Sequence, residues 1–141
     1  MTPELEALAR RAVASKRWRW MPGMVDTLGN RANEDGWPSY STIDYGATDI
    51  VEVVTWKVRP PRSALPNLTD PATLGCLLAL VREAWGDPGF CAAQSSTKIK
   101  GTDILGWDAF GSLHGRSCKG MLYRSEAEAL VAALENGGGG A

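Results

Sequence analysis

The stretch from residue 65 to residue 85, LPNLTDPATLGCLLALVREAW, constrains the fold more than any other part of the chain. Asp70 suits the N-cap of a helix because its carboxylate accepts hydrogen bonds from the first helical N–H groups, and Pro71 suits the first helical position, where no donor is needed. Large apolar side chains then recur at helical spacing, at Leu74, Leu77, Leu78, Val81 and Trp85. Gly86, Asp87 and Pro88 end the pattern. The sequence therefore predicts an amphipathic helix that must bury one face.

Two further helices are predicted near the two ends of the chain. Thr2 and Pro3 open the first, and its buried stripe is Leu5, Leu8, Ala9, Ala12 and Val13. Ser125 and Glu128 form the S-x-x-E capping box of the last helix. The apolar face of that helix is Ala127, Leu130, Val131 and Leu134, and Asn136-Gly137 ends it. The glycine-rich residues 137–141 are expected to form a flexible tail.

The segments between these helices have the patterns of strands and turns. Arg-Trp-Arg-Trp at residues 17–20 alternates with period 2, which predicts a short strand with both indoles on one face. Residues 49–58 predict a clear strand, residues 90–100 a weaker one, and residues 105–113 another, with Leu105, Trp107, Ala109 and Leu113 on one face. Strands joined by short turns favour antiparallel pairing. We therefore expect one α+β domain over residues 1–136, an antiparallel sheet packed with three helices as an α-β-α sandwich.

Composition excludes several classes of protein. The chain has 141 residues and a net charge of -1, which argues against a dedicated nucleic-acid binder, whose affinity depends on neutralising phosphates. Its longest apolar run, residues 77–81, is far shorter than the ~20 residues that cross a bilayer. The N-terminal residues lack an apolar signal region, and three irregularly spaced cysteines fit free thiols in a reducing compartment. A soluble intracellular protein is expected.

No catalytic or metal-binding motif emerges. Asp108, Ser112 and His114 would share one face of a strand, but Asp108 and His114 would lie about 20 Å apart, so a solvated polar face is the better interpretation. The glycine-rich residues 111–120 lack the Gly-Lys-Ser/Thr of a phosphate-binding loop that runs into a helix. His114 and Cys118 supply at most two of the three or four ligands that zinc needs. We expect no enzyme activity, no metal and no cofactor.

Two groups of charged residues are candidates for binding. Residues 26–56 hold six carboxylates and one basic residue, Arg31. We expect residues 25–64 to form an irregular acidic insertion, a long loop or an irregular hairpin, that docks on a basic protein surface or is simply solvated. Its predicted partner-binding residues are Trp37, as an exposed aromatic anchor, with Glu34, Asp35 and Asp44. An alternative anion site is the basic cluster of Arg116, Lys119 and Arg124, although we favour the interpretation that this cluster is a solvated turn.

The Trp-Arg alternation at residues 17–20 also has two interpretations. Bases could stack on a cationic and aromatic strip. The other interpretation, which we favour, places Trp18 and Trp20 in the core and Arg17 and Arg19 in solvent, because residues on opposite faces of a strand do not form one contact surface.

Three segments resemble a known family: LEALARRAVASKRWRWMPGM, LPNLTDPATLGCLLALVREAW and YRSEAEALVAALE. They are similar to the phage ABA-sandwich proteins, small proteins of phages and prophages with an α-β-α layered fold and no established activity. The similarity covers Leu5–Met24 and Leu65–Glu135 and carries over no catalytic residues. It implies a phage or prophage accessory protein in the cytoplasm of a bacterial host, where it binds a host protein or ribonucleoprotein complex, for example as an anti-CRISPR-type inhibitor. The alternative is a small-molecule-binding protein that sequesters a nucleotide signal.

Overall fold

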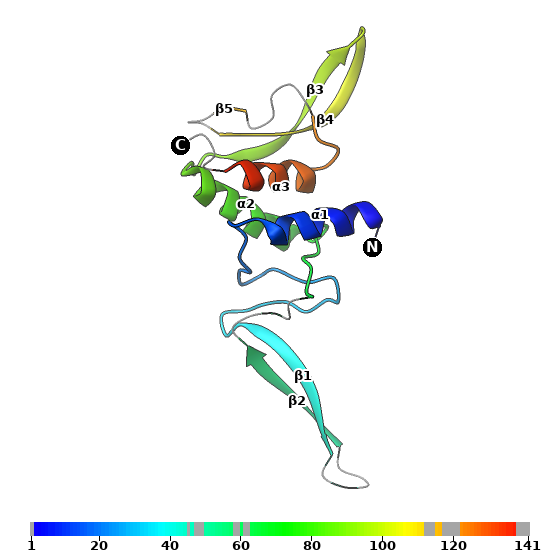
Figure 1. Cartoon of the computed structure of the whole chain (residues 1–141), viewed down its shortest axis with the longest axis vertical. Helices are drawn as coiled ribbons and strands as arrows, with labels where there is room; N and C mark the ends of the chain where they lie inside the picture. Colours follow the sequence, from blue (N-terminus) through cyan, green and yellow to red (C-terminus); the bar gives the residue numbers. More distant parts are fainter. Residues whose placement is uncertain are drawn as a thin grey trace.

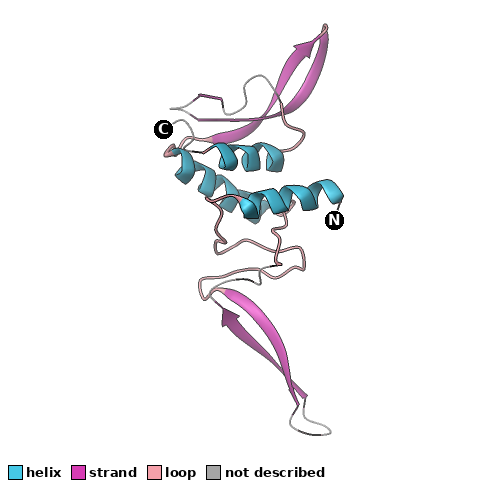
Figure 2. Cartoon of the chain, viewed as in Figure 1, coloured by secondary structure: helices cyan, strands magenta, loops and turns pink. Residues whose placement is uncertain are grey.

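The computed structural model describes residues 2–44, 46, 50–57, 60, 63–111, 115–116 and 122–137. Its helices are α1 (Pro3–Ala14), α2 (Pro71–Trp85) and α3 (Glu126–Asn136). Its strands are β1 (Trp37–Asp44), β2 (Ile50–Lys57), β3 (Cys91–Ile99), β4 (Thr102–Gly111) and β5 (Gly115–Arg116). The strands pair antiparallel in two sheets, β1-β2 and β3-β4-β5 (Figure 2). The predicted α+β class is confirmed, with the strands divided between two sheets rather than gathered in one.

The helices begin where the sequence predicts. The side chains of Thr2, Asp70 and Ser125 each accept a hydrogen bond from a backbone N–H three residues further along the chain, at 3.2, 2.9 and 3.1 Å. Helix α2 ends at Gly86, whose φ of 62° is the left-handed conformation that glycine adopts without strain. The predictions of these helix ends are confirmed, because each end depends on only a few neighbouring residues.

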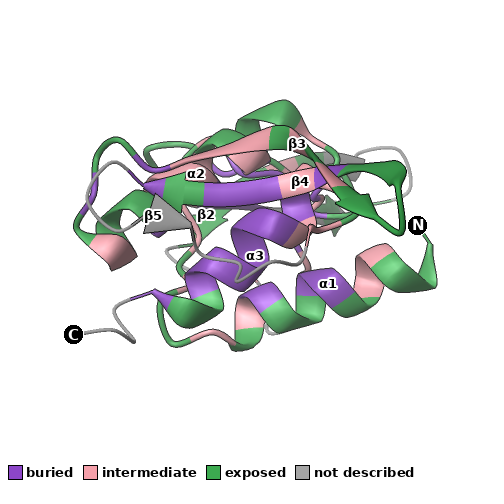
Figure 3. Cartoon of the chain, turned by 90° about the horizontal axis from the view of Figure 1, so that it is seen from above, coloured by how far each residue is buried: buried purple, intermediate pink, exposed green. Residues whose placement is uncertain are grey.

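Helix α3 lies at the centre of the helical part. It contacts α1 and α2 on one side and strands β3 and β4 on the other, so all three helices lie to one side of the three-stranded sheet (Figures 1 and 3). A helix surrounded in this way is buried nearly all round, and its buried residues are Ala127, Ala129, Leu130, Val131, Ala132, Ala133 and Leu134. Four of these seven are alanine, and small side chains let neighbouring backbones approach closely.

The buried face of α2 is rotated slightly from the predicted stripe. Leu77 and Val81 are fully buried, as predicted, and Leu80 joins them, whereas Leu74 and Leu78 are only half-buried. Trp85 is also half-buried, and its ring stacks on Phe90 with centroids 5.3 Å apart. Helix α3 packs against α2, and Trp85 Nε1 donates to the carbonyl oxygen of Ala133 in α3 over 2.8 Å.

The β3–β4 hairpin is buried only in its inner half. Tyr123 and Trp107 exchange two backbone hydrogen bonds of 2.7 Å, and Gly106 lies so close to Leu122 that a Cβ atom would collide with it. Beyond these contacts with Leu122 and Tyr123, the hairpin extends away from the helices (Figure 1). Leu105 is therefore 81% exposed, and its predicted place on the buried face was wrong.

Asp108 corrects a second prediction about β4, because it is 2% exposed rather than solvated. Its neighbour Ala109 packs in the core on the opposite face of the strand, so β4 is covered on both faces at this point. Ser112 and His114 lie outside the described residues.

Residues 17–20 do not form the predicted strand. Trp18 N–H instead donates to the carbonyl oxygen of Ser15 over 3.1 Å, in a turn that follows α1. The favoured burial pattern is nevertheless present: Trp18 and Trp20 pack partly buried against the core, and Arg17 and Arg19 are exposed. Period-2 alternation was misleading because an irregular segment can also direct alternate side chains inward.

The acidic segment is more regular than predicted. The predicted strand at 49–58 is present as β2, and it pairs with β1 over eight residue pairs, from Trp37 opposite Lys57 to Asp44 opposite Ile50. The resulting β1–β2 hairpin projects from the end of the molecule opposite to β3 and β4 (Figure 1). Its base, where β1 begins, positions the candidate site.

Candidate functional site

The loop that leads to the hairpin is fastened to the start of α2. Val25 N–H donates to Thr73 Oγ1 over 2.9 Å, and that hydroxyl donates to Asp70 Oδ2 over 2.9 Å. The guanidinium of Arg31 lies 3.1 Å from Asp70 Oδ1 and lowers the pKa of this carboxyl to about 2. These contacts hold residues 23–32 as part of the folded body, not as a free loop.

Asp26 belongs to this support and not to an acidic surface. It is buried, and its Oδ1 accepts the backbone N–H groups of Leu28 and Asn30 over 3.0 and 2.8 Å. Buried carboxylates generally require hydrogen-bond donors, and these two N–H groups supply them. The carboxylate of Asp26 therefore closes a turn inside the protein. Counting Asp26 among the surface charges of residues 26–56 was wrong.

The next turn presents two carboxylates to solvent. Asn33 and Gly36 exchange backbone hydrogen bonds of 2.9 and 3.0 Å, and Asn33 Oδ1 accepts Asp35 N–H over 2.8 Å. Gly36 has a φ of 114°, which favours glycine at this position. Glu34 and Asp35 occupy the two corners of the turn, and both side chains are exposed.

Trp37 follows this turn and is only 3% exposed, so its prediction as an exposed anchor was wrong. Its ring packs edge-on against Trp20, with centroids 4.8 Å apart and an interplanar angle of 64°. Trp20 in turn meets Trp18 edge-on, with centroids 5.4 Å apart. The indole is buried because β1 begins at this residue and packs its first side chain against the segment that follows α1. Sequence spacing gave no sign of that long-range contact.

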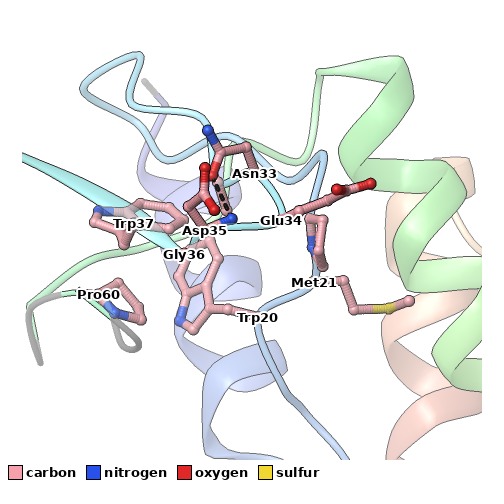
Figure 4. A pocket seen from close by; sticks show the side chains of 10 residues that line it. Trp20, Met21, Asn33, Glu34, Asp35, Gly36, Trp37 and Pro60 are labelled. Carbon is pink, nitrogen blue, oxygen red and sulfur yellow. Dashed lines mark hydrogen bonds between the residues drawn. The ribbon is translucent and has the colours of Figure 1, made fainter. Parts of the chain in front are cut away.

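The acidic turn and the indoles enclose a hollow of about 240 Å³ (Figure 4). Its lining residues are Trp20, Met21, Pro22, Ala32, Asn33, Glu34, Asp35, Gly36, Trp37 and Pro60. Indole and proline rings thus share the lining with two carboxylate side chains, of which Asp35 lies nearer the indoles and Glu34 extends away from them (Figure 4). The described lining contains no basic residue. An aromatic wall and a carboxylate both attract a cation, and Arg is well suited because its planar guanidinium stacks on rings and pairs with carboxylates. We call this site the acidic hollow.

The structure brings together three of the four predicted partner-binding residues. Trp37, Glu34 and Asp35 line the acidic hollow, whereas Asp44 is the last residue of β1, at the other end of the strand. Trp20, Met21 and Pro60 were missed as lining residues. For Trp20 the only signal was its alternation with arginine, and Met21 and Pro60 gave none.

The alternative anion site is not assembled in the described part of the chain. Arg124 is exposed and lines a groove with Arg11, but Glu4 and Glu128 line the same groove and oppose the positive charge. The side chain of Arg116 and the whole of Lys119 lie outside the described residues.

A different basic hollow of about 520 Å³ follows α1. It is lined by Lys16, Arg17, Trp18, Arg19, Leu80, Glu83 and Ala84. Arg19 and Glu83 form an ion pair of 2.7 Å across it, which lowers the pKa of Glu83. Within the described residues the buried Nε1 of Trp18 has no hydrogen-bond partner. The lining retains a net positive charge from Lys16 and Arg17.

Among the described residues, no three His, Cys, Asp or Glu side chains are grouped so that they could hold a metal ion. No helix in this part of the chain is long and apolar enough to cross a membrane. Cys76 and Cys91 are free thiols, and burial raises the pKa of Cys76. Cys118 lies outside the described residues.

Comparisons with protein-family models, with curated proteins and with solved structures found no match. The resemblance to phage ABA-sandwich proteins therefore stays a prediction.

Proposed function

We propose that the chain is a non-enzymatic binding protein that holds a basic segment of a partner protein, with an arginine side chain of that segment in the acidic hollow. The observation that carries this proposal is that Glu34 and Asp35 line the same hollow as the indoles of Trp20 and Trp37, without a basic lining residue in the described part. Two different attractions for a cation, one from a ring face and one from a carboxylate, act at the same place.

The expected affinity of this contact is modest. A cation on an indole contributes about 0.5–1 kcal/mol at an exposed site and ~2 kcal/mol when it is desolvated. An exposed ion pair adds at most about 1 kcal/mol. One arginine therefore strengthens binding by roughly ten- to a hundredfold, since 1.4 kcal/mol corresponds to a factor of ten. The partner must supply further contacts, and a segment with several basic residues does so along the acidic hairpin.

The carboxylates of the hairpin assist the encounter with such a partner. Asp44, Asp49 and Glu52 follow Glu34 and Asp35 along the chain, with no basic residue between Arg31 and Lys57. A surface with one sign of charge attracts partners of the opposite sign and raises the association rate at low salt. Under the phage resemblance the partner is a bacterial host protein or ribonucleoprotein, and inhibition of a defence system is the specific role.

Calorimetric titration with a short arginine-glycine peptide tests the proposal. We expect the wild type to bind it and the double variant Glu34→Gln/Asp35→Asn to bind at least tenfold more weakly. The matched control Glu4→Gln/Asp103→Asn removes two exposed carboxylates outside both the hollow and the β1–β2 hairpin and should retain most of the affinity. A peptide with citrulline in place of arginine has a similar shape without the charge and should not bind. Equal binding by the two double variants would contradict the proposal.

A second candidate function is the binding of a small anion, which the basic hollow favours. Lys16 and Arg17 leave a positive charge beside the unpartnered indole nitrogen of Trp18. An anion with several oxygens, such as a nucleotide phosphate, suits these donors. Titration with a cyclic dinucleotide distinguishes the two functions, because only anion binding is lost in Lys16→Gln/Arg17→Gln and only peptide binding in Glu34→Gln/Asp35→Asn.

A further inference from the structure

Two hairpins extend from the helices at opposite ends of the molecule (Figure 1). One is the β1–β2 hairpin. The other is the outer half of β3 and β4, residues 96–105, which begins beyond the contact of Gly106 with Leu122 and which we call the β3–β4 arm. A two-stranded hairpin alone is marginally stable in water. Each projection would therefore gain stability if it packed against another protein surface.

Both projections have exposed apolar side chains. In β2, Val54 and Trp56 are two residues apart and so lie on one face, and Trp56 is 46% exposed. In the β3–β4 arm, Thr97 is opposite Ile104 and Ile99 is opposite Thr102, which places both isoleucines on one face. Both isoleucines are exposed. Paired apolar side chains on an uncovered sheet face are typical of a protein contact.

The two projections have opposite charge. The described residues at the end of the β1–β2 hairpin, 43, 44, 46 and 50–52, include two carboxylates, Asp44 and Glu52, and no basic residue. The β3–β4 arm contains one carboxylate and two amines, Asp103, Lys98 and Lys100. Lys98 is opposite Asp103 in the strand register, which leaves Lys100 as the excess charge. Complementary charge favours contact between the arm and the hairpin.

One molecule cannot bring these two projections together, because they point away from each other (Figure 1). We propose that a second copy of this chain docks its β3–β4 arm against the β1–β2 hairpin, so that copies associate head to tail. In the described sheets both strands of the hairpin and the outer side of β3 are unpaired edges, so backbone hydrogen bonds can extend the contact. A head-to-tail contact closes into a ring or continues as a chain, depending on its rotation. This inference does not depend on the acidic hollow.

Sedimentation velocity of the full chain over a range of concentrations tests the inference. The mass should rise above the 15.1 kDa of one copy as the concentration rises, and added salt should oppose this rise. Glu52→Lys alone and Lys100→Glu alone should each weaken self-association at least tenfold, because Glu52→Lys cancels the negative charge of the described hairpin end and Lys100→Glu makes the arm negative like the hairpin. An equimolar mixture of the two variants should associate again, because the wild-type arm of Glu52→Lys can dock on the wild-type hairpin of Lys100→Glu.

Control variants separate this inference from the proposed function. Glu4→Lys, on α1 and outside both projections, should associate like the wild type. Glu34→Gln/Asp35→Asn, which is designed to lose peptide binding, should also self-associate normally. A wild type that remains monomeric at millimolar concentration refutes the inference, as does a mixture of Glu52→Lys and Lys100→Glu that fails to associate although both variants show the wild-type circular dichroism spectrum.

Discussion

Replacement of Trp37 by alanine tests whether its indole is a structural part of the hollow. Trp37 is 3% exposed and packs edge-on against Trp20. Truncation of a buried tryptophan costs about 3–5 kcal/mol, which includes the aromatic pair of roughly 0.5–1.5 kcal/mol. Because Trp37 borders an open hollow, water can fill part of the space that remains, and we expect the lower end of this range. At about 3–4 °C per kcal/mol, the melting temperature should fall by roughly 10 °C.

Trp56→Ala is the matched control, because it removes the same side chain from the same hairpin at a half-exposed position. Trp56 is opposite Pro38 in the register, and a cross-strand pair contributes about 0.2–1 kcal/mol. Urea unfolding followed by far-ultraviolet circular dichroism measures both variants without depending on tryptophan fluorescence. If Trp37→Ala is no more destabilising than Trp56→Ala, the indole of Trp37 is not packed as described.

Variants at three further positions test the supports of the fold. Asp70 has a pKa of about 2 in the folded protein against an ordinary 3.8, so it stabilises the fold above about pH 4 and this contribution is lost as the pH falls towards 2. Asp70→Asn should therefore lower stability at neutral pH and flatten the acid loss between pH 4 and 2, and an unchanged acid profile would contradict the Arg31 contact. Gly111→Ala should lower the free energy of unfolding in urea by about 1–3 kcal/mol, because a Cβ atom would collide with the Asp87 carboxylate and lie 2.9 Å from the Phe90 ring. A variant as stable as the wild type would show that Gly111 does not lie this close to Asp87 and Phe90. Ser125→Ala should cost about 0.5–2 kcal/mol, and Ser125→Asp should retain the cap; equal losses in both would mean that the cap contributes nothing.

The helices could be predicted from the sequence because their signals are local. Asp70 and Ser125 cap helices through bonds to residues three positions away, and apolar spacing identified the buried sides of α1 and α3. Strand β2 was also predicted, because its β-branched and aromatic residues are typical of strands. Strand β1 was not predicted, and its segment was expected to be a long loop or an irregular hairpin, because serine and proline obscure its pattern and the strand forms by pairing with β2.

The candidate site could be predicted only in part, because it combines local charge with long-range packing. Clustered carboxylates and turn residues identified Glu34 and Asp35 correctly as exposed. The sequence could not show that Trp20 packs on Trp37, since that contact joins two distant segments, and without it Trp37 was predicted to be exposed. The same limit explains Asp26, whose carboxylate was counted as surface charge although it closes a buried turn.

Binding of an arginine side chain in the acidic hollow can be followed by nuclear magnetic resonance of the six indole N–H groups. On titration with an arginine-glycine peptide, the signals of Trp20 and Trp37 should shift in a saturable manner. The signal of Trp85, whose Nε1 donates to the carbonyl oxygen of Ala133 over 2.8 Å, should not move. Glu34→Gln/Asp35→Asn should abolish the shifts while the rest of the spectrum stays the same. Shifts confined to Trp56, or no shift at all at saturating peptide, would show that the acidic hollow does not bind arginine.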